Sequence, residues 1–391
     1  MIQLKKILFI FSFFGSINSE QLPTITVIGI GRLGLCTALC LEQAGYDVVG
    51  VDLDQSYVNK LNNKTFCSFE PSVNDYLQKS THFHATTNLD EGLSHANLIL
   101  IIVDTPSTTA PEAYDHSRLG MVLQEINKRT VTHKHIVICC TVFPGYIDRI
   151  GKFLLKDCIE TTLSYNPEFI AQGDIIRGFE NPDIVLIGQG SSDAGDILEY
   201  MHKRLCRNNP TIFRMSAASA ELAKLAINCF ITTKIAFANM VGDIADNTPN
   251  ADKEIILRAV GGDSRIGYKY LKPGYGFGGP CFPRDNRAFA SYARSVDITP
   301  FIPEATDNAN KIHAQIQAAA IENQNPTGEL VFEDVAYKPQ ALVPIIEESQ
   351  KLAVAAILAR KGRSIIIRDR SVIIDMVKAK YGNLFTYEIT D

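Results

Sequence analysis

The chain has 391 residues, of which 46% are hydrophobic and 21% charged, a length and composition typical of a globular protein with two or three domains. Lys and Arg number 38 against 43 Asp and Glu, for a net charge of -5. This balance excludes a general electrostatic affinity for nucleic acid or for an anionic membrane surface. We therefore expect no nucleic-acid partner and no membrane partner, and local sites must carry the function.

Residues 1–21 form an extension that resembles a secretory leader. Lys5 and Lys6 precede an apolar run, Ile7–Phe14, which is followed by small and polar residues. The run is too short to span a bilayer, which takes about 20 apolar residues, but its order of charge and then apolar residues fits a signal peptide. We place this extension outside the fold. A cytoplasmic location is expected, with export or a lumenal location as the alternative.

The nine cysteines follow neither metal-binding nor disulfide spacing. Their number is odd and no C-x-x-C pair occurs, so we predict no metal site and reduced thiols. Several cysteines lie inside apolar runs, and we expect eight of the nine to be buried packing residues. The exception is Cys281, which lies in a loop rich in glycine.

Residues 22–210 alternate between short β-branched runs and helical stretches. Such alternation predicts an α/β fold with a Rossmann-like, doubly wound parallel sheet. The runs and stretches that carry this prediction are Ile25–Ile28, Leu33–Ala44, Val48–Asp52, Leu98–Val103 and Ile136–Thr141.

Residues 211–322 predict a helical central region. The segment Met215–Asp246 reads as one long, nearly all-apolar helix, and such helices are buried between domains or subunits. We therefore expect at least a homodimer formed through this segment. Further helical patterns follow at Asp252–Val260, Asn286–Arg294 and Glu304–Glu322.

Residues 323–391 predict a second, shortened α/β domain. Apolar, strand-like runs occur at Leu330–Ala336 and Ser364–Arg368, on either side of a helical pattern at Ser349–Arg360. This is about half of a Rossmann-like unit, and we expect a shortened carboxyl-terminal domain of that kind.

A glycine turn, Gly29–Gly34, directly follows the first predicted strand and opens a helix. Its sequence G-I-G-R-L-G provides a tight turn, a bare backbone for a pyrophosphate and close packing of helix on strand, while the helix amino end attracts the anion. The second strand ends in Asp52, at the distance where an acid binds the ribose 2′-hydroxyl and repels a 2′-phosphate. The pattern predicts a dinucleotide site that prefers NAD to NADP.

Two groups of polar residues downstream suit catalysis. Glu221, Lys224 and Asn228 lie three and four residues apart in the apolar helix, hence on one face, where buried polar groups have to be paired. Two interpretations of these residues remain open at this point: a structural ion pair, or a pair of side chains that binds a negative oxygen of the substrate. The loop Lys272–Asp285 holds Cys281 among glycines and prolines, with a basic and an acidic residue after it, which suits a positioned nucleophile.

Two further segments follow predicted strands, Cys140–Gly145 and Asn166–Phe169. Ligands of a doubly wound sheet bind at the carboxyl ends of its strands. Glu168 in the second segment is placed to act as a base or to orient a water. Each segment fits ordinary turn chemistry equally well.

Taken in order, these motifs resemble the UDP-glucose/GDP-mannose dehydrogenase family over roughly residues 24–310. The resemblance implies oxidation of the 6-hydroxymethyl group of a nucleotide sugar to a carboxylate, with two NAD and one water. The motifs that carry it are Gly29–Gly34, Val103–Ser107, Thr141–Gly145, Asn166–Phe169, Glu221–Lys224 with Asn228, Asp263–Gly267 and Gly276–Asp285.

The resemblance also implies roles for single residues. Catalytic roles fall on Cys281, Lys224, Asn228, Asp285, Glu168 and Thr141. Contacts with NAD fall on Gly29, Ile30, Gly31, Arg32, Leu33, Gly34, Asp52, Thr105 and Thr141. Contacts with the nucleotide sugar fall on Glu168, Phe169, Lys224, Asn228, Arg265, Tyr275, Gly276, Gly278 and Lys338.

Within this reading the first expectation is a UDP-glucose 6-dehydrogenase that works through a cysteine thiohemiacetal and thioester. Three alternatives stay open. One is a dehydrogenase of another nucleotide sugar, such as a UDP-N-acetylhexosamine or GDP-mannose. Another is a degenerate, non-catalytic relative that binds NAD. The last is a two-electron hydroxyacid dehydrogenase, for which Cys281 would be dispensable.

Overall fold

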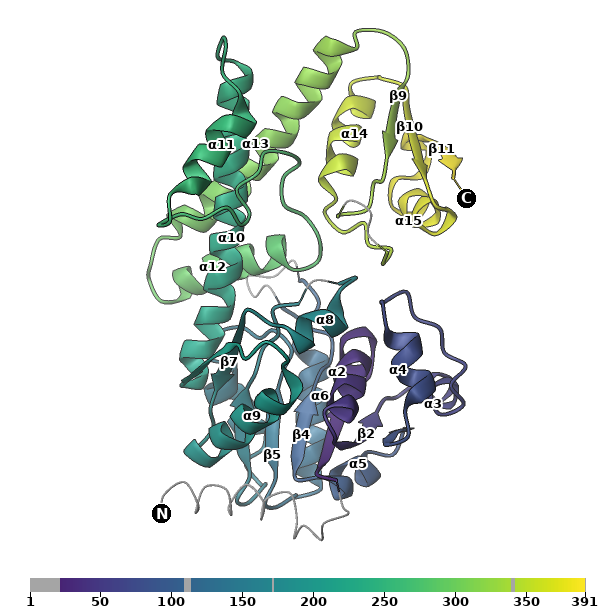
Figure 1. Cartoon of the computed structure of the whole chain (residues 1–391), viewed down its shortest axis with the longest axis vertical. Helices are drawn as coiled ribbons and strands as arrows, with labels where there is room; N and C mark the ends of the chain where they lie inside the picture. The colour runs from purple at the N-terminus through teal and green to yellow at the C-terminus, as the bar shows by residue number, and fades with distance from the viewer. Residues whose placement is uncertain (1–21, 109–113, 171, 339–341, 391) are drawn as a thin grey trace. The chain divides into compact units, whose positions relative to one another are not determined.

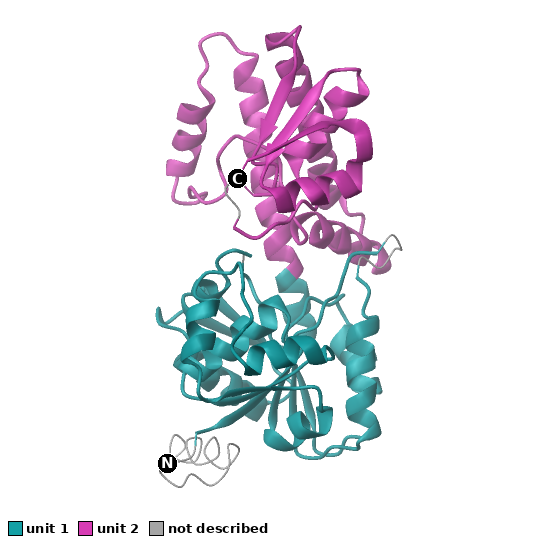
Figure 2. Ribbon diagram, turned by 90° about the vertical axis from the view of Figure 1, so that its right-hand side faces the viewer, with its two compact units in different colours: residues 1–108, 114–224 teal, residues 109–113, 225–391 magenta. Residues whose placement is uncertain are grey.

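The computed structural model describes residues 22–108, 114–170, 172–338 and 342–390. The predicted leader, residues 1–21, lies outside this part of the chain. The protein forms two compact units (Figure 2). Unit 1 is built from Met1–Thr108 and Tyr114–Lys224, and unit 2 from Thr109–Ala113 and Leu225–Asp391.

Unit 1 is built on a sheet of eight strands in the order β3-β2-β1-β4-β5-β6-β7-β8. All neighbours are parallel except β6 and β7, which are antiparallel, and the order reverses between β1 and β4, where doubly wound sheets bind ligands. The strands are β1 Thr24–Ile28, β2 Asp47–Val51, β3 Phe83–Thr86, β4 Leu98–Ile101, β5 His135–Ile138, β6 Thr162–Tyr165, β7 Ile184–Gly188 and β8 Thr211–Met215.

Helices cover both faces of this sheet (Figure 1), as the alternating sequence pattern predicts. On one face α2, α8 and α9 pack over Ile25 and Val27, and on the other α5 and α6 pack over Ile28 and Ile99. The helices are α2 Arg32–Gln43, α3 Gln55–Asn62, α4 Val73–Lys79, α5 Leu89–His95, α6 Ser117–Lys128, α7 Lys152–Leu154, α8 Ile175–Glu180 and α9 Ser192–Leu205. The predicted Rossmann-like, doubly wound fold is confirmed.

Helix α10, Ala217–Asp246, runs from unit 1 into unit 2. Within the described ranges it is the one helix long and apolar enough to span a bilayer, a test that core helices also pass. Its buried polar side chains, among them Glu221 and Asn228, bond to other parts of the protein, as in a core helix. In the single chain part of the helix surface is exposed, with Phe230 68% exposed, so the expected burial between domains or subunits stays a prediction.

Unit 2 contains three more helices and a small parallel sheet. The helices are α11 Lys253–Gly262, α12 Phe282–Ser295 and α13 Phe301–Gln324. The sheet has the order β11-β10-β9, from β9 Leu330–Glu333, β10 Ile365–Asp369 and β11 Thr386–Ile389, with helices α14 Gln350–Arg360 and α15 Ser371–Tyr381. The sequence pattern predicts neither β11 nor α15. The strand β11 has only four residues, of which two are exposed, and it carries no apolar run.

None of the nine cysteines, all within the described residues, forms a disulfide. Six of them are buried, as expected of packing residues. The expectation that eight are buried is wrong for Cys67, which is exposed, and for Cys158, which is partly exposed. Cys281 is exposed as well.

Candidate functional site

The glycine turn of unit 1 has the geometry of a dinucleotide-binding turn. Gly29 adopts φ +87°, a conformation that favours glycine, and its N–H donates to the carbonyl of Val51 at 2.8 Å. A Cβ on Gly34 would lie 1.9 Å from the carbonyl oxygen of Gly29. Only glycine therefore allows α2 to begin this close to the turn.

Gly31, by contrast, faces open space. A Cβ built on it meets nothing within 4 Å, and as the residue that caps α2 it offers no side-chain bond to the first N–H groups of the helix. Helix amino ends with free N–H groups bind phosphate. Asp52 is partly exposed directly after β2. The turn thus fits a pyrophosphate and the acid fits a ribose, which together make a site for NAD.

Thr105 and Thr141 lie together after β4 and β5, at the same edge of the sheet. The hydroxyl of Thr105 donates to the carbonyl oxygen of Thr141 at 2.8 Å. The loop after Thr141 is held by Glu221 of α10, whose carboxylate accepts from the N–H groups of Gly145 at 2.6 Å and Ile147 at 2.9 Å. Glu221 therefore fixes a loop of the predicted cofactor site.

Glu168, Phe169 and Lys224 form a second cluster in unit 1. Lys224 is only 6% exposed, and its Nζ donates to the backbone carbonyl of Glu168 and lies 4.3 Å from the centre of the Phe169 ring. Burial raises the pKa of the Glu168 carboxyl to about 8, an effect that the charge of Lys224 opposes. The prediction that the buried lysine is paired is confirmed by its bond to the Glu168 carbonyl.

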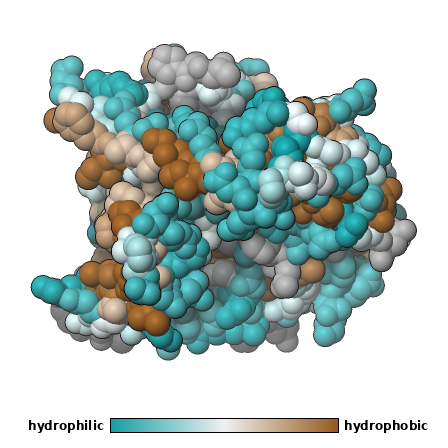
Figure 3. All heavy atoms as spheres, turned by 90° about the horizontal axis from the view of Figure 1, so that it is seen from above, coloured by the Kyte–Doolittle hydropathy of each residue, from teal (hydrophilic) through white to brown (hydrophobic). Residues whose placement is uncertain are grey.

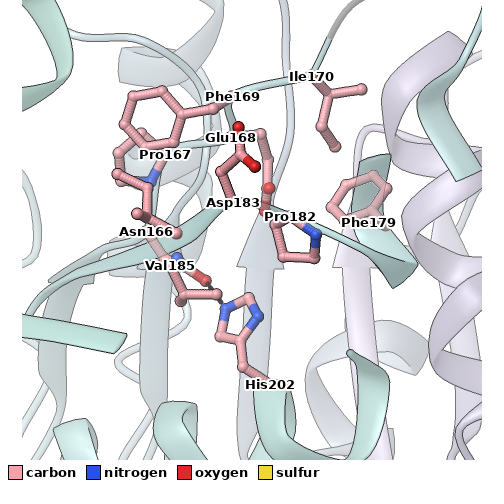
Figure 4. Close-up of a pocket in the computed structure, with 11 residues that line it drawn as sticks. Asn166, Pro167, Glu168, Phe169, Ile170, Phe179, Pro182, Asp183, Val185 and His202 are labelled. Atoms are coloured by element: carbon pink, nitrogen blue, oxygen red, sulfur yellow. Dashed lines mark hydrogen bonds between the residues drawn. The ribbon is translucent and has the colours of Figure 1, made fainter. Parts of the chain in front are cut away.

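A small cavity lies beside Glu168 (Figure 4). Its volume is about 80 Å³, enough for several waters. Asn166 lines it and is fixed on both sides, because its Nδ2 donates to Leu186 and its Oδ1 is 2.7 Å from Nε2 of the buried His202. The sequence reading missed His202, which lies on α9 with no motif around it. The lining residues are Asn166, Pro167, Glu168, Phe169, Ile170, Phe179, Pro182, Asp183, Ile184, Val185 and His202.

In unit 2, Cys281 lies at the amino end of α12. The partial positive charge of a helix amino end stabilises a thiolate. One turn later Asp285 is fully buried, and its Oδ2 accepts from Asn228 Nδ2 at 2.6 Å while its Oδ1 accepts from Arg284 Nε at 3.0 Å. Three residues predicted as catalytic, Cys281, Asp285 and Asn228, thus belong to one group of packed elements.

The loop before Cys281 carries Tyr275, Gly276 and Gly278. A Cβ on Gly278 would lie 2.3 Å from the carbonyl oxygen of Glu348, so the chain passes there as bare backbone. The N–H groups of Gly276 and Gly278 make no hydrogen bond to any residue that the structure describes. They are donors that a bound ligand can use.

The two remaining predicted substrate residues stand apart from these groups. Arg265 is exposed and pairs with Asp263, with Nη2 and Oδ2 2.6 Å apart, and this pairing lowers the pKa of the Asp263 carboxyl and raises that of the guanidinium. Lys338 is exposed. Among the residues described, no group of three or more His, Cys, Asp or Glu side chains could hold a metal ion.

The sequence matches two domains of one family. Residues 23–206 match the NAD binding domain, and residues 218–312 the central domain, of the UDP-glucose/GDP-mannose dehydrogenase family. The UDP-glucose 6-dehydrogenase of Rickettsia bellii is 31% identical over 293 residues, which are 73% of this chain and 66% of that protein. The GDP-mannose 6-dehydrogenase of Pseudomonas syringae pv. tomato is 28% identical, over 89% of this chain and 81% of that protein.

Solved structures agree with these matches. The UDP-glucose dehydrogenase of the archaeon Pyrobaculum islandicum superposes with a TM-score of 0.85 at 26% identity, covering 96% of this chain and 87% of that chain. With the glycine turn and Asp52 in place, the cofactor is NAD. The chain is an NAD-dependent dehydrogenase and belongs to the UDP-glucose/GDP-mannose dehydrogenase family.

Proposed function

We propose that the protein oxidises a UDP-hexose at C6 to the uronic acid in two successive NAD-dependent steps, with UDP-glucose as the first candidate substrate. The observation that carries this proposal is Cys281 at the amino end of α12, with the buried Asp285 one turn later and held by Asn228. A two-step oxidation without release of the aldehyde needs a covalent anchor. A positioned thiol supplies one.

The cofactor fits the glycine turn and supplies one chemistry, the acceptance of a hydride in each oxidation. The first N–H groups of α2 would hold its pyrophosphate, and Asp52 would accept hydrogen bonds from its ribose hydroxyls. Arg32 and Leu33 contribute backbone to this turn, while Thr105 and Thr141 border the site at the sheet edge.

The chain's own residues act on the sugar. In the first oxidation the C6 alcohol loses a hydride and a proton and becomes an aldehyde. The thiolate of Cys281 then adds to the aldehyde carbon, and Lys224 and Asn228 stabilise the negative oxygen of this thiohemiacetal. Loss of a second hydride, with the hydroxyl proton, gives a thioester.

Hydrolysis completes the reaction. Water attacks the thioester carbon, the carbon–sulfur bond breaks and the thiolate of Cys281 is regenerated together with the carboxylate product. We assign the proton transfers to Glu168 and Asp285, with Thr141 orienting the water. Burial of Glu168 supports this role, because a carboxyl with a pKa of about 8 exchanges protons readily near neutral pH.

The nucleotide sugar is assigned to the loop before Cys281 and to charged residues around it. The free N–H groups of Gly276 and Gly278 suit oxygen atoms of the sugar or its phosphates. Contacts by Tyr275, Arg265 and Lys338 belong to the same proposal, with Phe169 beside Lys224.

We further propose a homodimer formed through α10. Four apolar side chains of α10 are exposed, Phe230 by 68%, Phe237 by 45%, Met240 by 48% and Ile244 by 59%. Their spacings of seven, three and four residues put them on one face of the helix. The molecule seen from above is mostly hydrophilic with separate hydrophobic patches (Figure 3). A row of exposed apolar side chains on one helix face suits a second copy.

One experiment tests activity, substrate and mechanism together. NADH is counted per sugar consumed, across UDP-glucose, GDP-mannose, UDP-N-acetylglucosamine and UDP-N-acetylmannosamine. Two NADH per UDP-glucose support the proposal. Two NADH per molecule of another sugar in the panel support the second candidate function, a dehydrogenase of that nucleotide sugar. The similarity to a GDP-mannose 6-dehydrogenase favours this second candidate. One NADH per substrate contradicts the thioester route. A melting temperature raised by NAD but by none of the sugars indicates a non-catalytic NAD-binding protein.

A further inference from the structure

Three buried side chains grip the backbone of the loop that leads to Cys281. Asn239 of α10 accepts from the N–H of Gly274 at 2.9 Å. Asn310 of α13 accepts from the N–H of Phe277 and donates to its carbonyl, both at 2.9 Å. His313, also of α13, lies with Nε2 2.7 Å from the carbonyl of Gly274. Side chains thus occupy both polar backbone groups at each end of this four-residue segment.

Asp243 supports the contact that His313 makes with the loop. Nδ1 of His313 lies 2.8 Å from Oδ2 of Asp243, so the ring bridges a carboxyl and the carbonyl of Gly274. Both ring nitrogens thus face oxygen atoms, and the two contacts fix the orientation of the ring. His313 is 7% exposed, which shields these contacts from water.

The grip also explains a glycine. A Cβ on Gly276 would lie 2.1 Å from Oδ1 of Asn310. The side-chain amide of Asn310, which binds Phe277, therefore packs directly against the backbone of Gly276. Any side chain at this position would push Asn310 out of reach.

The same face of α10 holds the chain on both sides of Cys281. Asn228 binds Asp285, four residues after the cysteine, and Asn239 binds Gly274, seven residues before it. Residues 228 and 239 lie eleven apart, about three helical turns, and so share one face. Two side chains of a single helix thus hold the chain before and after Cys281.

We infer that Asn239, Asn310 and the Asp243–His313 pair are positioning residues, which fix the loop Gly274–Phe277 and through it the reach of Cys281. The inference rests on the proposed function for the role of the cysteine. None of these four side chains touches the reacting atoms. They act by holding backbone, and displacement of a reacting group by about 1 Å lowers turnover up to a hundredfold.

Two variants test the inference, His313→Leu and Asn310→Asp, the second of which keeps the acceptor for the Phe277 N–H but loses the donor. Asp246→Asn is the matched control, because Asp246 lies on the same helix as Asp243 but pairs with Lys253 at the surface. The full-length protein is measured by amide hydrogen exchange of Gly274 and Phe277, by iodoacetamide labelling of Cys281 followed by mass spectrometry, and by kcat and KM for UDP-glucose and NAD.

We expect faster exchange of the loop amides in both variants, a changed rate of Cys281 labelling and a kcat lowered roughly tenfold to a hundredfold, with KM for NAD unchanged. The melting temperature should fall in both variants, because each removes hydrogen bonds of a buried side chain. Asp246→Asn should behave as the parent. Loop exchange and labelling equal to those of the parent overturn the inference, as does a loosened loop with full kcat. If the parent itself oxidises no nucleotide sugar, the proposed function fails, and exchange and labelling still decide whether the grip holds the cysteine. Where His313→Leu does not fold, Asn310→Asp gives the decision.

Discussion

Asn228 and Asp285 meet in the interior of unit 2, where the amide of one donates to the carboxylate of the other at 2.6 Å. The two residues come from different helices, α10 and α12, and Asp285 is 0% exposed. A buried carboxylate is costly unless it is paired. This contact therefore stabilises the acid and, through the helix it belongs to, sets the place of Cys281.

Replacing Asn228 by Ala should leave Oδ2 of Asp285 buried without its donor. An unsatisfied buried acceptor costs about 1–3 kcal/mol, so the midpoint of urea unfolding should fall accordingly. Turnover should fall as well, since the variant also removes a donor for the developing oxyanion. Equilibrium unfolding and initial rates check the two effects. Unchanged stability would mean that the other partners of Asp285, Arg284 among them, satisfy the acid.

Cys281→Ser should abolish formation of the uronic acid, because a serine hydroxyl at this position does not form the thioester. The first oxidation can persist, so at most one NADH per sugar is expected. Cys67→Ser is the control, since Cys67 is the other exposed cysteine among the described residues and has no proposed role. NADH counting and mass spectrometry of the sugar product check both. Full conversion to the acid by Cys281→Ser would refute the mechanism.

The glycine turn could be predicted from the sequence because its function is local. A strand, a run of six residues and a helix fix the geometry, and the structure adds only that Gly34 is needed for packing while Gly31 faces open space. The helix α10 was predicted with equal ease, within two residues at its amino end, from a long apolar run.

The grip on the Cys281 loop could not be predicted in that way. Asn239 and His313 lie far apart in the sequence and in no recognisable motif, and their role appears only when α10 and α13 pack on the same loop. The extra strand β11 was missed for a similar reason, because pairing with β10 rather than local hydrophobicity defines it. Contacts between distant segments are what a single sequence does not display.

The two glycines of the turn should respond differently to alanine. Gly31→Ala adds a methyl group to open space, so the fold should be unaffected while the affinity for NAD falls, because the methyl group takes room that the pyrophosphate needs. Gly34→Ala puts its Cβ 1.9 Å from the carbonyl of Gly29 and should lower the melting temperature itself. Calorimetric titration with NAD and thermal unfolding separate the two. Tight NAD binding by Gly31→Ala would contradict the placement of the pyrophosphate.

Glu168 should give the reaction a pH dependence on its acidic side. Burial raises the pKa of this carboxyl from 4.5 to about 8, so the carboxylate that acts as base accumulates only as the pH rises through 8. We expect the kcat of the parent to increase up to about pH 8 and then to level off. The Glu168→Gln variant should lose this rise of kcat with pH, together with most of the activity.

The same shift has a consequence for stability. The folded state favours the neutral form of Glu168. The contribution of this residue to the free energy of unfolding is therefore fully present below about pH 4.5 and is lost as the pH rises through about 8. Between these pH values the free energy of unfolding of the parent protein should fall as the pH rises, and that of Glu168→Gln should not show this fall. A parent protein whose kcat and stability are both flat across this window would place Glu168 in a polar environment and exclude it as the base.

The row of exposed apolar side chains on α10 predicts how the protein assembles. Phe237→Glu puts a charge in the middle of the row and should prevent association, since a dimer interface tolerates no unpaired buried charge. Phe301→Glu is the matched control, because Phe301 is 75% exposed but lies at the start of α13, outside the row. In sedimentation velocity the parent and Phe301→Glu should run as dimers or larger, and Phe237→Glu as a monomer. A parent that sediments as a monomer, or a Phe237→Glu variant that still dimerises, would show that α10 does not form the interface.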